Sequence, residues 1–563
     1  MVGKLPALAL VICISILGYH TILGLPSDIV FPAYLILLLS LAFSLQYKKK
    51  IGKVYIVLWI LCLITLVSLS YTLIPFNVPD GFPDANYVYQ LLRIYEVRER
   101  IIMGVGTGMA FNYSFYPLFE AFVLLLSKIS GIPSVLILRF FFIFSMIFFF
   151  ITWVSIYKRL LNYMDAYVAL IIVLASGHFS VFFTRPLHPT FALMFVSLLF
   201  LIWTIRSPTS NNIYNFVIIG IILSLSIALS HNTTGLLVGL VFLISLFLIL
   251  LGKVLPYKPY RFNKVGIKRE IFLVIFMVFA IYFIYNVLAA TPFFEKAIIT
   301  TLMKYLGLIF NRKITFHESV LGVRRKFNVV SPEETTILLK DIKDRLGLAS
   351  LAFYLVLSGI FLLKRILGKR HGNTKAVTIH ALLDLIAISF AFLILIGTLV
   401  WLPGIRDYYW RFYSYYFLFS APAFASMISR IPKKSIKLAI IFIVLLSSFF
   451  WKPSISLGID MPYELSDPRI GIDQGILLST YIREKYEGLY ISGTRFTLNV
   501  IGPFSEKWVK GVIYSETDFN RVLKMDIPIV LSPIELAIAG LNENIIHDFN
   551  IIYNSHQLFM LMC

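Results

Sequence analysis

Long apolar runs separated by short polar segments form the dominant pattern of the chain. Runs such as 135–157 and 272–288 reach or approach the roughly 20 apolar residues that a helix needs to cross about 30 Å of hydrocarbon. The first run, 5–23, follows Lys4 as a signal peptide would, but it lacks a convincing cleavage site and a second apolar run follows at once, so we interpret it as a span. The pattern predicts thirteen spanning helices, centred near residues 14, 36, 64, 147, 175, 197, 221, 243, 280, 356, 390, 418 and 444.

The composition supports this interpretation. Hydrophobic residues make up 59% of the chain and charged residues 14%, with a mean hydropathy of +0.85, whereas soluble domains average about 45–50% apolar and about 25% charged residues. A soluble fold cannot bury so large an apolar share. Cys13 and Cys62 fall inside predicted helices and Cys563 is the last residue, so no pair of cysteines has the spacing of a metal site or a disulfide framework.

The net charge of +21 would suggest nucleic acid as a partner of a soluble protein, so its distribution matters. With the amino terminus inside, the predicted cytosolic segments collect lysine and arginine and contain only Asp165 and Glu270 as acids. This is a strong positive-inside bias. We interpret the basic stretch 253–269 as a topology determinant near anionic headgroups, and we expect no nucleic-acid partner. The predicted location is the cytoplasmic membrane.

The same orientation leaves three segments outside the cytosol, where function is expected. The first outer loop, 76–133, contains an apolar stretch at 116–129 that is too short to span and predicts a helix in the membrane interface. The second outer loop is 291–346. In the third segment, 453–563, β-rich runs alternate with helix-like stretches, which predicts a small extracytosolic α/β domain after an α-helical polytopic membrane domain, 1–452. The strand-like runs are 489–492, 512–514, 527–531 and 551–553, and 474–486 is helix-like.

Ionisable residues are scarce inside the predicted spans. Asp384 lies near a cytosolic end and Arg139 near an outer end, which counts against ion-coupled transport, since transporters keep such groups at the midplane. Acids appear instead at the outer surface, where Asp80 and Asp84 precede a predicted helix at 87–100. Asp84 is placed either to accept a proton from an incoming hydroxyl or amine or to cap that helix.

Three short motifs follow one another in this part of the chain: Asp84-Ala85-Asn86-Tyr87, Phe115-Tyr116-Pro117-Leu118-Phe119 and Leu138-Arg139-Phe140. Together they resemble the GT-C superfamily of membrane glycosyltransferases, which includes protein mannosyltransferases, the aminoarabinose transferase of lipid A and oligosaccharyltransferases. In that superfamily an acidic residue opens the first large outer loop, a Tyr-Pro-Pro-Leu-like interfacial helix follows, and the next span begins with an Arg-Leu-like pair. The resemblance implies a GT-C-like membrane fold.

A further likeness lies before the twelfth predicted span, at Ile405-Arg406-Asp407-Tyr408-Tyr409-Trp410-Arg411-Phe412. The superfamily often has an arginine followed by an aromatic residue there, at the level of the phosphate of a polyprenyl-phosphate donor. Guanidinium groups bind phosphate oxygens bidentately, so Arg411, then Arg406 and Arg139, are candidate donor-phosphate ligands. An interfacial belt of arginine and aromatic residues is the alternative.

The chain also departs from the superfamily pattern. Many members carry an acid where this chain has Thr184-Arg185-Pro186-Leu187-His188-Pro189, and the oligosaccharyltransferase Trp-Trp-Asp signature is absent, which argues against an oligosaccharyltransferase. Arg185 and His188 are candidate substrate-binding residues, together with Tyr87. A divalent metal is left open as a cofactor, with His188 as its candidate ligand. His317 and Glu318 become substrate-binding candidates if the second outer loop closes over the site as a lid.

The resemblance implies a glycosyltransferase that uses a monosaccharide on a polyprenyl (dolichyl) phosphate and an unidentified acceptor, which is a protein, a glycan or a lipid. Asp84, with Asp80 as its substitute, is the candidate general base. The expected source is a prokaryote, and an archaeon in particular. Two alternatives stay open: a transporter or flippase of lipid-linked sugars, and a non-catalytic partner in cell-envelope assembly.

Overall fold

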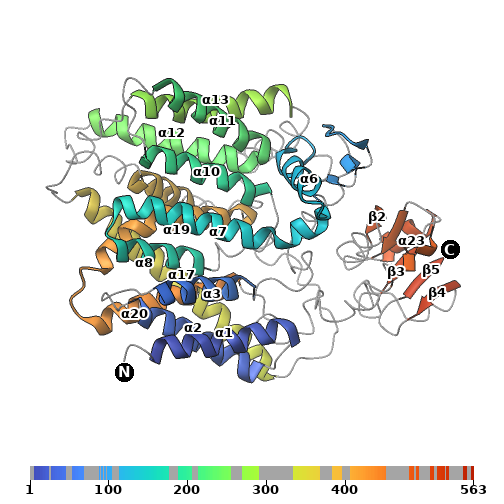
Figure 1. The fold of residues 1–563 in the computed structure, drawn as a ribbon, viewed down its shortest axis with the longest axis horizontal. Coiled ribbons are helices and arrows are strands. Elements are labelled where there is room, and N and C mark those ends of the chain that lie inside the picture. The colour runs from blue at the N-terminus through green and yellow to red at the C-terminus, as the bar shows by residue number, and fades with distance from the viewer. Residues whose placement is uncertain are drawn as a thin grey trace, which may run out of the picture.

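The computed structural model consists of packed helices followed by a small sheet near the carboxyl terminus (Figure 1). It describes residues 5–23, 27–45, 53–68, 88, 91–92, 94–96, 98–103, 113–176, 188–205, 213–254, 269–290, 334–367, 383–395, 406–451, 478, 481–482, 484–486, 490–493, 508–512, 516–525, 528–531, 550–554 and 559–562.

Each predicted span centre falls in a helix, in chain order. The labelled helices are α1 (Leu5–Leu23), α2 (Ser27–Ser44), α3 (Lys53–Ser68), α6 (Leu118–Ser130), α7 (Ser134–Leu160), α8 (Tyr163–Ala175), α10 (His188–Ile205), α11 (Ile213–Ser230), α12 (Asn232–Val254), α13 (Arg269–Leu288), α17 (Glu334–Leu367), α19 (Arg406–Ile428) and α20 (Lys434–Leu445), followed by the 3-10 helix η3 (Leu446–Trp451). Residues 383–395 are helical as well. The number of these helices that cross the membrane stays a prediction.

The fifth predicted centre, residue 175, is the last residue of α8 rather than its middle. The helix begins early because Asn162 caps it: the Asn162 side chain accepts the backbone N–H of Asp165 at 2.9 Å and donates to the Asp165 carboxylate at 2.7 Å. A side chain that accepts the N–H three residues later is a strong start signal for a helix. The apolar pattern alone placed this element too far along the chain.

The outward faces of the helices are apolar. Large hydrophobic side chains such as Ile151, Tyr214 and Leu288 are exposed, and an exposed apolar surface of this extent marks a membrane protein rather than a water-soluble one. By length and composition, two described stretches could cross a membrane, Ile143–Leu160 and Arg345–Lys364. Shorter apolar helical stretches are Leu5–Leu17, Ile29–Ser44, Val54–Thr65, Tyr163–Leu174, His188–Thr204, Tyr214–Ser230, Thr234–Ser245 and Leu383–Leu395.

Polar side chains inside the helical part form hydrogen bonds from one helix to another. Trp153 on α7 donates to Ser197 on α10 at 2.9 Å, and Tyr34 on α2 donates to Ser448 at 2.6 Å. Such bonds between helices are a common means of association where water is excluded. Aromatic rings fill the space around them, for example Trp153 against Phe419 with ring centroids 5.8 Å apart.

The 76–133 segment contains α6, close to the predicted 116–129. Its first turn follows Pro117, and it ends at Gly131, whose φ of +69° allows the Gly131 N–H to reach the Ser127 carbonyl. Glycine adopts this left-handed conformation without steric cost, which makes it the usual residue after a helix end. Earlier in the segment, the described residues between 88 and 98 are helical. Among them Val88, Leu91 and Tyr95 are buried, so one face of the predicted 87–100 helix packs inward.

The described strands all lie after residue 489 and form one five-stranded sheet. They are β1 (Tyr490–Gly493), β2 (Trp508–Val512), β3 (Ile529–Leu531), β4 (Asn550–Asn554) and β5 (Phe559–Met562), in the order β2-β1-β3-β5-β4. β1 pairs with β2 and β3 in parallel, whereas β5 pairs antiparallel with β3 and β4. Helix α23 (Glu516–Leu523) connects β2 to β3. The predicted strand runs touch or overlap β1, β2, β3 and β4.

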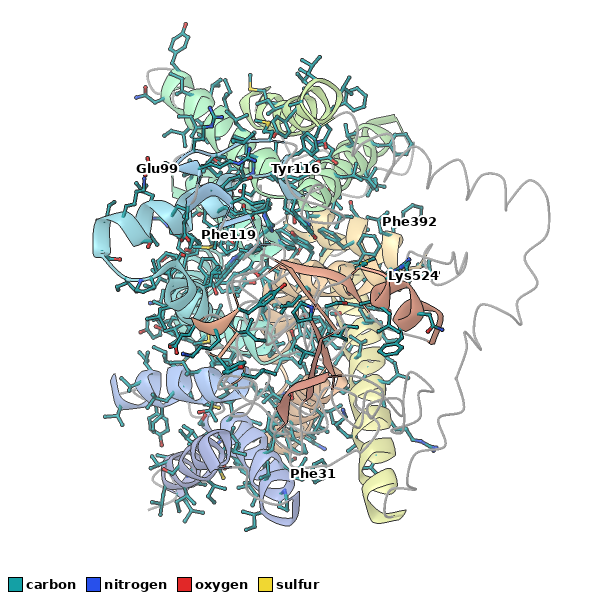
Figure 2. All side chains as sticks on the ribbon, turned by 90° about the vertical axis from the view of Figure 1, so that its right-hand side faces the viewer. Phe31, Glu99, Tyr116, Phe119, Phe392 and Lys524 are labelled. Carbon is teal, nitrogen blue, oxygen red and sulfur yellow. The ribbon has the colours of Figure 1, made fainter. Side chains whose placement is uncertain are left out.

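Helix α6 and the sheet lie at the same end of the stacked helices, the right-hand side in Figure 1. Figure 2, which looks onto this end, shows Tyr116 and Phe119 within the packed side chains near α6. The end of the stacked helices at which α6 lies is called the α6 end below.

Candidate functional site

The structure describes only part of the predicted site. Six candidates lie outside the described residues: Asp80, Asp84, Tyr87, Arg185, His317 and Glu318. Three more have a described backbone, but their side chains lie outside the described part: Arg139 in the second turn of α7, and Arg406 and Arg411 in the first turns of α19. His188 is described in full, and it leads to a polar cluster at the α6 end.

His188 is the first residue of α10 and lies against the first turn of α6. Its Nε2 atom is 2.8 Å from Oε1 of Glu120, and the two side chains are 1% and 0% exposed. The contact is an ion pair when the imidazole is protonated, although it is not aligned as a hydrogen bond. Within the described part of the chain, neither carboxylate oxygen of Glu120 has an aligned hydrogen-bond donor. A buried carboxylate in this state is costly unless a neighbouring charge compensates it.

Aromatic rings enclose the imidazole of His188. Tyr113 stacks on it with ring centroids 4.6 Å apart and planes 23° apart. Phe119 meets it edge-on at 5.5 Å. These contacts fix the orientation of the ring, because a planar group packed on a face and an edge has little rotational freedom.

His231, between α11 and α12, is the second histidine at this end. Its Nδ1 atom accepts the backbone N–H of Thr234 at 3.1 Å and lies 2.9 Å from the Thr234 hydroxyl, so the side chain caps α12. An accepting Nδ1 is unprotonated, which places the proton of the neutral ring on Nε2. The His231 ring also stacks with Tyr113, with centroids 6.4 Å apart. Tyr113 therefore contacts both histidines.

The Tyr-Pro-Leu motif is held against the end of α13. The Tyr116 hydroxyl donates to Oδ1 of Asn286 at 2.7 Å, and Nδ2 of Asn286 donates to the Tyr282 carbonyl at 2.8 Å. The neighbouring Tyr285 hydroxyl donates to the backbone carbonyl of Phe115. Two successive residues of the motif are thus bound by two successive residues of α13.

Tyr95 adds a buried phenol to the same cluster. Its side chain is 1% exposed, and its hydroxyl has no hydrogen-bond partner among the residues that the structure describes. Burial raises the pKa of the Tyr95 hydroxyl, and the charge of Glu120 and the nearby Tyr285 raise it further. The neighbouring Glu96 accepts a hydrogen bond from Ser134 at 2.5 Å, which ties this stretch to the start of α7.

The cluster combines a carboxylate, two imidazoles and several phenols, groups that bind hydroxyls and exchange protons. In the described ranges, no group of three or more His, Cys, Asp or Glu side chains is placed to hold a metal ion. Glu120 and His188 are two candidate ligands rather than a complete set. The described residues thus support polar recognition and proton exchange.

The sequence analysis missed Glu120, Tyr113, His231 and Asn286. Glu120 had a recognisable signal, because it is an acid inside the apolar stretch 116–129 and such residues are expensive in apolar surroundings. His231 and Asn286 stand alone at the ends of apolar runs, where a polar residue is ordinary. Only the fold shows that they meet the 76–133 segment.

No family model matches the sequence, and no curated protein matches it either. Solved structures that this chain resembles include ArnT from Cupriavidus metallidurans bound to undecaprenyl phosphate, with 12% identity over 90% of this chain and 97% of that chain and a TM-score of 0.43. They also include AglB from Archaeoglobus fulgidus in complex with an inhibitory peptide and a dolichol-phosphate, with 12% identity over 88% of this chain and 72% of that chain and a TM-score of 0.44. ArnT and AglB are GT-C proteins, the superfamily that the motifs resemble. At 12% identity and TM-scores of 0.43 and 0.44, the likeness assigns neither a family nor an activity to this chain.

Proposed function

We propose that the protein is a glycosyltransferase of the GT-C class, which moves a monosaccharide from a polyprenyl (dolichyl) phosphate to an acceptor on the outer face of the membrane. The observation that carries the proposal is the position of the Tyr116-Pro117-Leu118 motif. This motif, singled out by its resemblance, lies in a buried polar cluster with the Glu120–His188 pair and the ends of α10, α12 and α13. The start of an apolar helix does not need such surroundings for packing alone.

In the proposed reaction, an acceptor oxygen or nitrogen forms a bond to the anomeric carbon of the sugar. The bond between that carbon and the phosphate oxygen breaks, and polyprenyl phosphate leaves. Asp84 takes the proton of the acceptor as general base. Arg411, Arg406 and Arg139 stabilise the charge that develops on the leaving phosphate. The alternative role of Asp84, capping of the 87–100 helix, predicts that Asp84→Asn keeps its turnover, since asparagine also caps helices.

The test is sugar transfer in membranes that contain the full-length protein. Radiolabelled polyprenyl-phosphate sugars and a cell-envelope acceptor mixture are supplied to the wild type, to Asp84→Asn and to the matched control Asp80→Asn. We expect Asp84→Asn to lower turnover by about two to four orders of magnitude at unchanged expression. Asp80→Asn should keep most of the activity, because it removes the same charge four residues away.

Each other outcome has a defined meaning. Loss in Asp80→Asn alone would move the base to Asp80, and equal transfer in all three proteins would remove both acids from the mechanism. If the wild type transfers none of the sugars, the glycosyltransferase assignment fails in favour of a flippase or a non-catalytic partner. Movement of an unmodified lipid-linked sugar across reconstituted vesicles would then identify the flippase.

A further inference from the structure

The contact between α6 and α10 at Glu120 and His188 buries two ionisable groups, which costs free energy that an apolar contact does not. Both side chains are almost completely buried, and their nearest nitrogen and oxygen are 2.8 Å apart. Each charge that is removed from water loses solvation free energy on the order of several kcal/mol. A buried ion pair therefore often stabilises a fold no better than apolar side chains of similar volume do. Stability alone therefore does not explain why an acid and a histidine occupy these positions.

The pair joins parts of the molecule that differ in role. Glu120 belongs to α6, and therefore to the 76–133 segment that contains the candidate acids Asp80 and Asp84. His188 begins α10, in the helical part of the fold. The surrounding contacts between α6 and α10 are ring contacts, such as Phe119 with Phe191 at 5.3 Å and Phe122 with Phe191 at 5.0 Å. A small shift between such rings leaves no buried charge without a partner, because the rings are apolar.

The Glu120–His188 contact is more sensitive to a shift of α6 than the ring contacts are. A shift of α6 that lengthens the 2.8 Å contact leaves a buried carboxylate without its partner, and this is far more costly than a shift between apolar groups. Tyr113, which belongs to the same 76–133 segment, stacks on the imidazole of His188. The pair therefore restricts α6 to one position relative to α10.

We propose that Glu120 and His188 are positioning residues, which hold the 76–133 segment in register with the helices so that its loop acid meets the substrate. This inference rests on the proposed function for its kinetic consequence. Its structural consequence, the fixed position of α6, does not depend on any activity. Neither residue is placed in contact with the reacting atoms.

The kinetic test compares four variants of the full-length protein with the wild type: Glu120→Gln, His188→Gln, the double Gln variant, and the apolar pair Glu120→Met with His188→Leu. We expect each single variant to lower kcat by about tenfold to a hundredfold, as small misplacements of catalytic groups do, with KM changed by less than about threefold. The double Gln variant should be no worse than the poorer single variant, because the two residues act as one unit.

The apolar pair separates positioning from stability. It should unfold within a few degrees of the wild type, since apolar pairs replace buried ion pairs without loss of stability, and its kcat should still fall by about tenfold or more. Wild-type kcat in the apolar pair would overturn the proposal. So would losses in the two single variants that multiply in the double Gln variant.

Protease sensitivity gives a measurement that needs no substrate. Lys128 is exposed on α6, and trypsin cuts a helix only where it opens locally. In detergent-solubilised protein, cleavage at Lys128 should be several-fold faster in Glu120→Gln and in His188→Gln than in the wild type. Cleavage at the wild-type rate in both would overturn the proposal. Lys128→Gln, which removes the cleavage site, identifies the fragment and should transfer sugar as the wild type does.

The two readouts distinguish two kinds of failure. If the wild type transfers no sugar but cleavage at Lys128 is still faster in the single variants, the proposed function is wrong and the structural link between α6 and α10 is supported. If the single variants transfer sugar normally and cleavage at Lys128 is unchanged, the positioning role of Glu120 and His188 is wrong and the proposed function stands.

Discussion

Tyr116 shows what a single side chain contributes at the α6 end. Its ring is buried and its hydroxyl donates to Asn286, a residue of α13 far along the chain. The Asn286 amide is oriented by its own bond to the Tyr282 carbonyl, so the carbonyl oxygen of that amide is the one presented to Tyr116. A tyrosine in this position connects the 76–133 segment to α13 through a bond that a phenylalanine cannot make.

We predict that Tyr116→Phe destabilises the protein by about 1 to 3 kcal/mol, because it leaves a buried amide oxygen without this donor. The measurement is the thermal unfolding of the purified protein in detergent. Tyr214→Phe is the matched control, since Tyr214 is 79% exposed at the start of α11, and it should unfold as the wild type does. Equal midpoints for Tyr116→Phe and the control would show that the bond to Asn286 contributes nothing.

Glu120 and His188 mark the limit of sequence analysis for individual residues. His188 was a candidate because it stands where many GT-C proteins carry an acid, and the structure brings it into the cluster. Its partner could not be named in advance, since Glu120 and His188 are far apart in the chain and a single sequence contains no information about long-range contacts. Asp84, Arg411 and the other candidates whose side chains lie outside the described part stay predictions.

At the scale of helices, α12 and α13 approach each other closely near the site, at Gly235 and Tyr282. A Cβ atom on Gly235 would lie 2.4 Å from Cδ2 of Tyr282, well inside van der Waals contact. Gly235 follows the cap at His231 by one turn, and Tyr282 supplies the carbonyl that orients Asn286. The missing side chain at Gly235 thus allows the two helices to bring the cluster together.

We predict that Gly235→Ala destabilises the protein by about 1 to 3 kcal/mol, the usual cost of adding a methyl group to a packed interior. Thermal unfolding in detergent measures the effect. Gly359→Ala on α17 is the control, because a Cβ at that position meets nothing within 4 Å. It should be neutral or more stable by up to about 1 kcal/mol, given the higher helix propensity of alanine. Similar midpoints for both variants would contradict the close approach.

The sequence predicted most elements and placed their ends less well. The apolar stretch 116–129 corresponds to α6, with an end that Gly131 determines. The start of α8 depends on the cap at Asn162, which hydropathy does not register. The β-rich runs touch or overlap β1 to β4, whereas β5 was not predicted, since Phe559–Met562 is a short apolar run without a strand-like alternation.

At the scale of the whole molecule, α6 and the sheet lie at the same end of the helices (Figure 1). The predicted topology also puts the 76–133 segment and the 453–563 domain on the same side of the membrane, outside the cytosol. One orientation therefore accounts for the positions of α6 and of the strands. The basic cytosolic segments supply the electrostatic reason for that orientation.

The native cysteines allow this orientation to be tested. We predict that a membrane-impermeant maleimide added to intact cells labels the protein at Cys563, because the predicted topology puts residue 563 outside the cytosol. Cys13 and Cys62 are buried and should not react. The control Cys563→Ser should lose the label. Labelling that appears only after the membrane is permeabilised would place the carboxyl terminus inside and reverse the topology.

The sequence by itself determined the class of the protein, the order of its helices and the predicted orientation, because hydropathy and loop charge act locally and add up along the chain. It also singled out the Tyr116-Pro117-Leu118 motif and His188. Only the tertiary structure decided that Glu120 meets His188, that Tyr113 contacts two histidines, and that Asn286 accepts from Tyr116. These contacts depend on how helices distant in the chain pack, and that packing is set by side-chain shape, such as the missing side chain at Gly235 against the Tyr282 ring, rather than by any local pattern.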